Sequence, residues 1–263
     1  MRAIILAAGR GSRLGHPHNR RPKCLLPFLE KPLLEWTLGT LRAEGFTDIH
    51  LVTGWHAEEI SFAGVTLHHN AAHLSTNMVH SLFCSGTSFR GDVLVSYADI
   101  LYERRILRAL MKSKGLLRVV VDDDFKPYYQ HRFGGNLGDA ESLVLEGSMI
   151  REIGTPRPDP GKVQGQYLGL VAFNAEGCRK AWSQWHRLRS ASNGGLWRHS
   201  RSVSKACMTD FIQELIDTGT PAQAVRVQRG WLEFDTGAEL RAYNLWERES
   251  ILGRYINVRE CGG

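Results

Sequence analysis

The first residues of the chain are suited to holding a polyphosphate. A short apolar run, 1–8, leads directly into a glycine-rich turn, 9–15, and the segment Arg21-Pro22-Lys23 adds a further cation. Glycines let the backbone approach an anion, amide N–H groups point at it, and Arg13 and Lys23 neutralise its charge. The pattern therefore predicts a nucleotide site, whereas an ordinary strand–helix turn would not need the two cations.

The spacing of this turn differs from two common nucleotide-binding motifs. The turn reads G-x-G-x-R, and Leu14 stands where the dinucleotide fingerprint G-x-G-x-x-G needs its third glycine. The predicted strand 49–54 ends in Gly54 rather than in the acidic residue that would bind a ribose. No Gly-Lys-Ser/Thr follows the turn, so a P-loop is also disfavoured. An NAD-dependent oxidoreductase is therefore a weak alternative.

Two aspartates lie at positions where α/β sheets bind ligands. Asp99 follows the predicted strand 93–97, and Asp235 lies at a strand-to-helix junction. The alternatives are a turn residue for Asp99 and a helix N-cap for Asp235. Three consecutive aspartates, 122–124, are a different case, because successive strand residues point in opposite directions. We expect those three to form a solvated strand end.

The elements that must position these residues alternate along the first half of the chain. Apolar runs predict strands at 3–8, 49–54, 65–69, 93–97 and 118–121, and amphipathic stretches predict helices at 33–43, 78–86 and 104–114. The second half predicts a hairpin at 143–152, strands at 166–173 and 224–228, and helices at 175–188, 205–217 and 237–246. We therefore expect an α/β fold with a Rossmann-like, mostly parallel sheet flanked by helices and a smaller irregular β/α region.

The chain has no convincing linker, so we expect one domain over 1–263. Its nucleotide-binding half would be 1–125 and its acceptor-binding half 126–263. The polar, basic segment 190–204 is a candidate lid, with a solvated connector as the alternative.

Composition narrows the class of protein. Five scattered cysteines form no C-x-x-C pair, which disfavours a disulfide framework and a zinc site. The sequence has no apolar run of membrane-spanning length, so we expect a cytoplasmic protein without a membrane partner. A net charge of +6 favours anionic ligands. Basic and aromatic residues cluster only near 197–201, so we expect no nucleic-acid partner. A homodimer is compatible with the sequence.

Three segments, 6–14, 21–27 and 31–35, resemble the opening of the nucleotidyltransferases that make nucleotide sugars, and most of all their phosphocholine and phosphonate cytidylyltransferase branch. The resemblance implies a nucleotide-diphospho-sugar transferase-like fold that uses CTP or another NTP. In that family the arginine and lysine matching Arg13 and Lys23 hold the phosphates, and two aspartates matching Asp99 and Asp235 hold Mg²⁺. The implied nucleotide-binding residues are Leu6, Ala7, Ala8, Gly9, Gly11, Ser12, Asn77 and Ser81. Read alone, Asn77 is equally a helix N-cap.

The acceptor side departs from the family pattern. Thr155 stands where relatives often carry lysine, and Gln166 where they often carry glutamate; Lys162 is the candidate replacement cation. Tyr128 and Trp197 adjoin basic rather than acidic residues, which favours an anionic or neutral phosphonate over a cationic head group. The candidate acceptor-binding residues are Tyr128, Lys162, Gln166 and Trp197.

The implied reaction is attack by a phosphate or phosphonate oxygen on the α-phosphorus of the triphosphate, with release of pyrophosphate. Because this nucleophile is already an anion, positioning and charge neutralisation suffice for catalysis, and no general base is needed. The alternatives are a sugar-1-phosphate nucleotidylyltransferase and a nucleotide-sensing module without catalysis.

Overall fold

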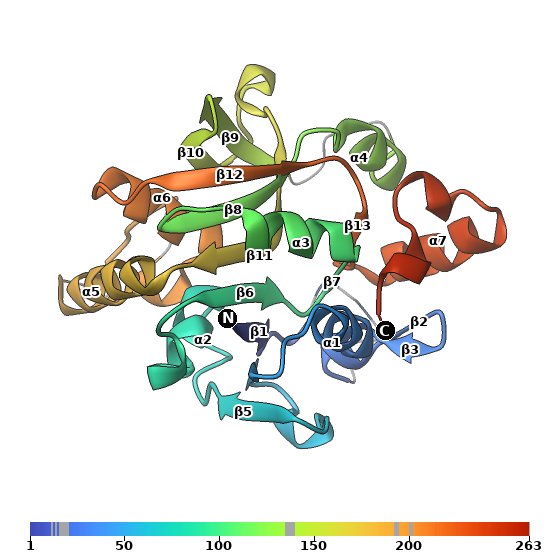
Figure 1. Ribbon diagram of the computed structural model, residues 1–263, viewed down its shortest axis with the longest axis horizontal. Helices are drawn as coiled ribbons and strands as arrows, with labels where there is room; N and C mark the ends of the chain where they lie inside the picture. The colour runs from blue at the N-terminus through green and yellow to red at the C-terminus, as the bar shows by residue number, and fades with distance from the viewer. Residues whose placement is uncertain are drawn as a thin grey trace.

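The computed structural model describes residues 1–11, 13, 15, 21–134, 140–191, 195–199 and 202–262. Over these residues the chain forms a nine-stranded sheet with the order β5-β4-β1-β6-β11-β8-β12-β10-β9 (Figure 1). The strands, in that order, are Val65–His69, Ile49–Thr53, Arg2–Ala7, Val93–Tyr97, Gln166–Phe173, Leu117–Asp122, Ala222–Val227, Met149–Pro156 and Glu141–Glu146.

The sheet is mostly parallel, as the alternating pattern predicts. Strands β5, β4, β1 and β6 run parallel to one another, and β12 runs parallel to β8. Strand β11 is antiparallel to both β6 and β8, and β10 is antiparallel to β12 and β9. The carboxyl ends of β1, β4, β5 and β6 therefore share one edge of the sheet, which is where α/β sheets bind ligands.

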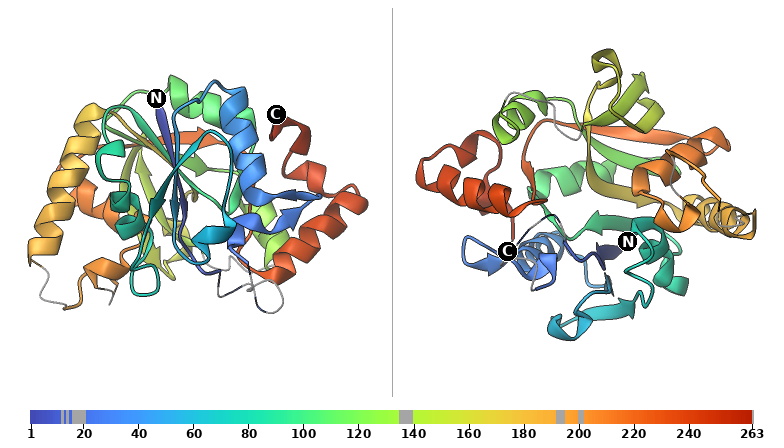
Figure 2. Two further views of the ribbon diagram at one scale, coloured as in Figure 1. Left: turned by 90° about the horizontal axis from the view of Figure 1, so that it is seen from below. Right: turned by 180° about the vertical axis from the view of Figure 1, so that it is seen from behind.

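Helices cover both faces of this sheet (Figure 2). One face carries α1 (Leu33–Ala43), α3 (Arg104–Lys112), α4 (Lys126–Arg132) and α7 (Gly237–Arg248), and the other carries α2 (Met78–Cys84), α5 (Ala175–Ala191) and α6 (Met208–Asp217). Successive residues of β1 alternate between the two hydrophobic clusters: Ile5 joins one, and Ile4 and Leu6 join the other. A strand buried on both faces reads as a continuous apolar run, which explains the sequence 3–8.

A small second sheet brings distant segments together. Strand β13 (Trp231–Glu233) pairs antiparallel with β7 (Ile100–Tyr102), with Glu233 opposite Ile100. The Phe234 amide donates to the Asp99 carbonyl oxygen at 3.0 Å. A third pair, β2 (Pro27–Phe28) with β3 (Lys31–Pro32), precedes α1. No helix among the described residues is long and apolar enough to cross a membrane.

Two local features differ from the sequence prediction. Helix α4 occupies Lys126–Arg132, where no helix was predicted. Asp122 is fully buried rather than part of a solvated strand end. Its carboxylate accepts hydrogen bonds from Trp231 Nε1 at 2.8 Å and from the Arg229 amide at 3.0 Å. The aspartate is retained in the core because these donors satisfy it, so its role is to hold the β12–β13 connection.

Candidate active site

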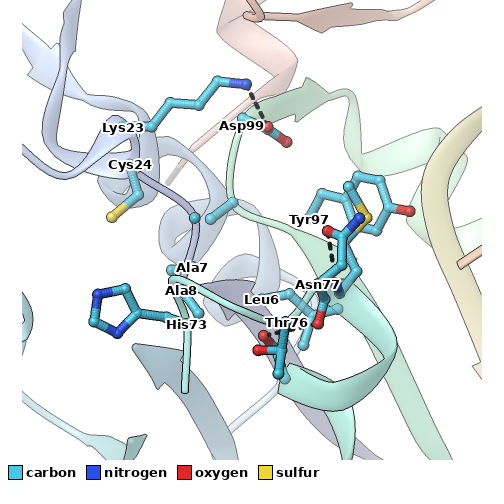
Figure 3. Close-up of a pocket in the computed structure, with 14 residues that line it drawn as sticks. Leu6, Ala7, Ala8, Lys23, Cys24, His73, Thr76, Asn77, Tyr97 and Asp99 are labelled. Carbon is cyan, nitrogen blue, oxygen red and sulfur yellow. Dashed lines mark hydrogen bonds and ion pairs between the residues drawn. The ribbon is translucent and has the colours of Figure 1, made fainter. Parts of the chain in front are cut away.

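A cluster of charged side chains lies at the carboxyl edge of the sheet. The Lys23 ammonium is 2.5 Å from Asp99 Oδ2 (Figure 3). It is also 3.0 Å from Asp235 Oδ1. Arg13 Nη2 lies 2.9 Å from the same Asp235 oxygen. The structure thus brings together the two cations and the two carboxylates that the sequence singled out, although they come from four separate segments.

Backbone pairing explains how the two aspartates meet. Asp99 follows β6, and Asp235 follows β13, whose partner strand β7 begins one residue after Asp99. The N-cap of α7 is Thr236, whose side chain accepts from the Glu239 amide, so Asp235 is not the cap. Lys23 begins a single 3-10 turn that buried Cys24 and Leu26 fix to the core.

Electrostatics keep this cluster charged. Burial alone would lower the pKa of the Lys23 ammonium, but the Asp99 and Asp235 carboxylates raise it above its ordinary value. Burial opposes ionisation of Asp235 as well, yet Lys23 and Arg13 hold the pKa of that carboxyl below its usual range. Lys23 is therefore an ammonium and Asp235 a carboxylate at neutral pH.

The carboxylates also fit a divalent cation. Asp99 Oδ1 is buried and receives no hydrogen bond from any described residue, although buried polar atoms are normally paired. One or two carboxylates combined with substrate phosphates form the usual protein site for Mg²⁺. Asp99 and Asp235 therefore form a donor set suited to such an ion.

A first cavity, which we call the donor pocket, opens beside this cluster at the end of β1. Figure 3 shows Lys23 reaching to Asp99 above Ala7 and Ala8, with Asn77 and Thr76 further along the pocket. Its lining residues are Leu6, Ala7, Ala8, Gly9, Lys23, Cys24, His73, Thr76, Asn77, Met78, Ser81, Tyr97, Ala98 and Asp99. A Cβ atom at Gly9 would meet no atom of the described residues within 4 Å, so there is open space beside the backbone at this position.

Several of the predicted nucleotide-binding residues line this pocket. Leu6, Ala7, Ala8, Gly9, Asn77 and Ser81 all do so. Gly11 adopts a φ of 66°, a conformation that glycine takes readily. Ser12 lies outside the described residues.

Asn77 and Ser81 also have structural roles. Asn77 is the N-cap of α2, its Oδ1 accepting from the Met78 amide at 2.9 Å. Its amide group also donates to the Lys205 carbonyl oxygen. Ser81 Oγ accepts from Asn70 Nδ2 at 3.0 Å. The N-cap interpretation of Asn77 is therefore correct, and it is compatible with a place in the pocket wall.

A second cavity, which we call the acceptor cleft, lies on the other side of the charged cluster. It has a volume of about 460 Å³, within the range of small-molecule sites. Its lining residues are Arg13, Met78, Tyr97, Tyr129, Arg132, Phe133, Ala140, Glu141, Pro156, Arg157, Gln166, Tyr167, Gly169, Cys207, Thr209, Glu233 and Asp235. Met78 and Tyr97 line both cavities, so the two spaces adjoin.

The candidate acceptor residues are distributed unevenly around this cleft. Gln166 lines it, whereas Tyr128 is buried behind it with its hydroxyl 2.6 Å from that of Tyr243. Lys162 is exposed and pairs with Glu152 at 3.1 Å. Trp197 packs against the hydrophobic cluster on the α5–α6 face. Of these four residues, the structure brings only Gln166 to the cleft wall.

Most of the residues that line this cleft were not predicted from the sequence, among them Tyr97, Glu141 and Glu233. Glu233 precedes Asp235 by two positions, and residues two apart on an extended segment share a side, so the spacing carried a usable signal. The Tyr97 ring packs directly on the backbone of Gly169, where an added Cβ atom would lie only 2.5 Å from the ring. That long-range contact left no local sequence signal.

Comparison with known proteins shows the family. The family model described as the MobA-like NTP transferase domain matches residues 3–193. A CTP:phosphoglutamine cytidylyltransferase of Campylobacter jejuni is 29% identical over 251 residues, which cover 91% of this chain and 98% of that protein. A CMP-5'-(3-aminopropyl)phosphonate synthase of Streptomyces rubellomurinus is 33% identical over 135 residues, which cover 48% of this chain and 22% of the other.

A solved structure shows the same fold. The inositol-1-phosphate CTP transferase from T. maritima superimposes with a TM-score of 0.72 at 18% identity, covering 97% of each chain. Because the family model spans most of the chain, the chain belongs to the MobA-like NTP transferase domain family and is a nucleotidyltransferase.

Proposed function

We propose that this chain transfers the cytidylyl group of CTP to a small acceptor that carries a phosphate or phosphonate, with release of pyrophosphate. The main support for this proposal is the position of the charged cluster between the two cavities. Lys23 and Asp99 line the donor pocket, Asp235 lines the acceptor cleft, and Lys23 contacts both carboxylates. A nucleotidyl transfer needs its cations at such a boundary, where the two phosphorylated substrates meet. The names of the similar proteins, which specify CTP or CMP, support the choice of nucleotide.

In this proposal the donor pocket holds CTP. Backbone groups at Leu6, Ala7, Ala8, Gly9 and Gly11 face the nucleotide, with Asn77 and Ser81 in the pocket wall. Ser12 is a candidate from the sequence alone. Arg13 and Lys23 are the catalytic residues, because each can pair with phosphate oxygens near the reacting phosphorus. A preorganised cation there stabilises the charge that grows in the transition state and needs no rearrangement during the reaction.

The chemical step is an in-line displacement. An acceptor oxygen forms a bond to the α-phosphorus of CTP, while the bond from that phosphorus to the β-phosphate oxygen breaks and pyrophosphate leaves with the electron pair. The nucleophile is an anion already, so the chain supplies orientation and charge rather than a base.

Mg²⁺ is the proposed cofactor, and Asp99 and Asp235 would hold it. When bound, the ion neutralises triphosphate charge that the two side-chain cations leave uncompensated. Asp99 Oδ1 supports this assignment, because none of the described residues gives it a hydrogen bond and a cation would satisfy it.

The acceptor cleft favours a substrate that carries an amino group as well as the phosphate. Tyr129 and Phe133 line it together with the carboxylates of Glu141 and Glu233. Acidic groups in the cleft wall suit an ammonium ion, while the faces of both rings already pack against the Arg132 guanidinium. The sequence instead favoured an anionic or neutral phosphonate, an interpretation that rested on Tyr128 and Trp197, and the cleft lining includes neither of them.

A pyrophosphate-release screen tests the proposal. Each of four triphosphates would be paired with phosphorylated glutamine, 2-aminoethylphosphonate, phosphocholine, glucose 1-phosphate and, as a matched control without the amine, ethylphosphonate. We expect turnover with CTP and an amino-bearing acceptor. Preference for glucose 1-phosphate would instead favour a sugar nucleotidylyltransferase, and no turnover with any pair would favour a sensing module.

A Glu233→Gln variant tests the acceptor side separately. It should raise KM for the amino-bearing acceptor roughly tenfold, which is about 1.4 kcal/mol of lost binding, and leave KM for CTP unchanged. An equal rise in both KM values would show that Glu233 supports the site as a whole.

A further inference from the structure

Arg132 is the most completely enclosed cation among the described residues around the cleft. It ends α4, and only 1% of its side chain is exposed. Its Nη1 lies 2.7 Å from Glu233 Oε2, its Nε 2.8 Å from Glu239 Oε1, and its Nη2 3.3 Å from Asp235 Oδ2. A buried guanidinium without partners would be strongly unfavourable, so three carboxylates from one short segment are its stabilising environment.

The Asp235 carboxylate is divided between two sets of partners. Its Oδ1 faces Lys23 at 3.0 Å and Arg13 at 2.9 Å, whereas its Oδ2 faces Arg132. A carboxylate that is held at one oxygen cannot rotate freely about its side-chain bonds. The contact with Arg132 therefore fixes the direction in which Oδ1 points.

A second connection runs through Glu239. While its Oε1 accepts from Arg132, its Oε2 accepts from the backbone amides of Asp235 at 2.6 Å and Thr236 at 2.9 Å. Arg132 thus restrains both the side chain of Asp235 and, through Glu239, its backbone. A residue that served only to attach α4 to α7 would not need both contacts to converge on one aspartate.

We propose that Arg132 is a positioning residue for Asp235, holding its carboxylate so that Oδ1 is presented to the cation and triphosphate site. The inference rests on the proposed function, in which Asp235 is a Mg²⁺ ligand. Arg132 does not itself contact the reacting groups, since its nitrogens are directed at the three carboxylates. Partners of this kind orient metal ligands, and their loss costs about 10- to 100-fold in metal affinity or activity.

The test measures cation binding rather than turnover alone. Mn²⁺ would be titrated into the full chain holding stoichiometric CTP, with free Mn²⁺ followed by electron paramagnetic resonance. In Arg132→Gln we expect the Kd for Mn²⁺ to rise at least tenfold, while the Kd for CTP in the presence of EDTA stays within threefold. Arg132→Lys keeps the charge but not the three-way contact, and it should fall between wild type and Arg132→Gln.

Two further variants make the result decisive. Arg226→Gln removes an exposed ion pair with Asp123, and it should leave Mn²⁺ affinity unchanged. Should Arg132→Gln fold poorly, the double variant Arg132→Gln/Glu233→Gln removes one of the unpaired carboxylates, and it should fold with the same weakened Mn²⁺ binding. The inference would be overturned if folded Arg132→Gln, or the folded double variant, bound Mn²⁺ as tightly as wild type and showed only a lower Tm.

The Asp235→Asn variant separates this inference from the proposed function. If Asp235→Asn loses Mn²⁺ affinity and Arg132→Gln does not, only the positioning role fails. If Asp235→Asn binds Mn²⁺ as wild type does, the assignment of Asp235 as a ligand fails, and the role of Arg132 fails with it.

Discussion

Replacing Lys23 with alanine would remove a side chain that contacts both aspartates of the charged cluster. Its side chain is 13% exposed, so bulk water cannot fully replace the lost ammonium. In the variant, less positive charge offsets the repulsion between the Asp99 and Asp235 carboxylates and an incoming triphosphate. We therefore expect a defect in the chemical step rather than in folding alone.

The magnitude follows from comparable preorganised contacts. Loss of one such group costs about 10²–10³ in kcat, or about 2.7–4 kcal/mol. Since Lys23 interacts with both carboxylates and, in the proposed function, with substrate, we expect the upper part of this range, roughly 10³. Lys23→Arg should keep part of the activity, because it retains the positive charge. The activity should not be complete, because the larger guanidinium does not fit between the Asp99 and Asp235 oxygens that lie 2.5 and 3.0 Å from the Lys23 ammonium.

The assay is single-turnover formation of pyrophosphate, with the enzyme in excess over CTP and the acceptor saturating. Lys31→Ala is a suitable control, because Lys31 lies over the Trp36 ring, outside both cavities. Thermal unfolding of each variant would separate loss of fold from loss of rate. A folded Lys23→Ala variant with a rate within threefold of wild type would refute the reasoning.

The pKa of Lys23 adds a condition on pH. Because the carboxylates raise the folded pKa above the ordinary 10.5, the ion pair stabilises the fold fully below that value. Its contribution is lost only as pH rises through the higher folded pKa. Wild-type rate should therefore show no decline from Lys23 deprotonation up to pH 10.

Other predictions concern the walls of the two cavities. In Gly169→Ala, the backbone φ of 82° and a Cβ atom 2.5 Å from the Tyr97 ring both disfavour the side chain. The variant should therefore lower the free energy of unfolding by roughly 2 kcal/mol, measured with urea, and raise KM for both substrates. Unchanged stability would contradict the close contact. Burial raises the pKa of the Cys24 thiol to about 12, so iodoacetamide at pH 8 should alkylate partly exposed Cys84 well before Cys24, as peptide mass spectrometry would show; rapid labelling of Cys24 would refute its burial. Asp99→Asn should weaken Mn²⁺ binding at least tenfold in the same resonance titration, and unchanged affinity would exclude Asp99 as a ligand.

Much of the first half of the fold could be predicted from the sequence. Helix 33–43 and strand 93–97 have the predicted bounds, because amphipathic helices and buried parallel strands leave strong local patterns. Strand 65–69 also has the predicted bounds, although it is an edge strand whose residues are partly or fully exposed. Helix α4 was missed because its seven residues, with a proline at the second position, have no clear period. The antiparallel direction of β11 depends on packing against β6 and β8, for which no local residue is a signal.

The donor half of the site was predictable because its parts are close in sequence or follow strands. Gly9, Arg13 and Lys23 all lie within the first 23 residues, and Asp99 follows a strand in a recognisable way. The acceptor cleft is built differently, from side chains of six or more elements that only the tertiary structure brings together. Tyr128 illustrates the consequence: the sequence drew attention to it, but its neighbour Tyr129 lines the cleft.

The most direct test of the central claim is phosphorus NMR of the purified chain incubated with CTP, Mg²⁺ and 2-aminoethylphosphonate or phosphorylated glutamine. The account predicts that free pyrophosphate and a CMP-linked anhydride of the acceptor appear together in equal amounts. It also predicts that both signals are lost in the folded Lys23→Ala variant. Slow hydrolysis of CTP without the anhydride signal, or equal product formation by that variant, would contradict the account.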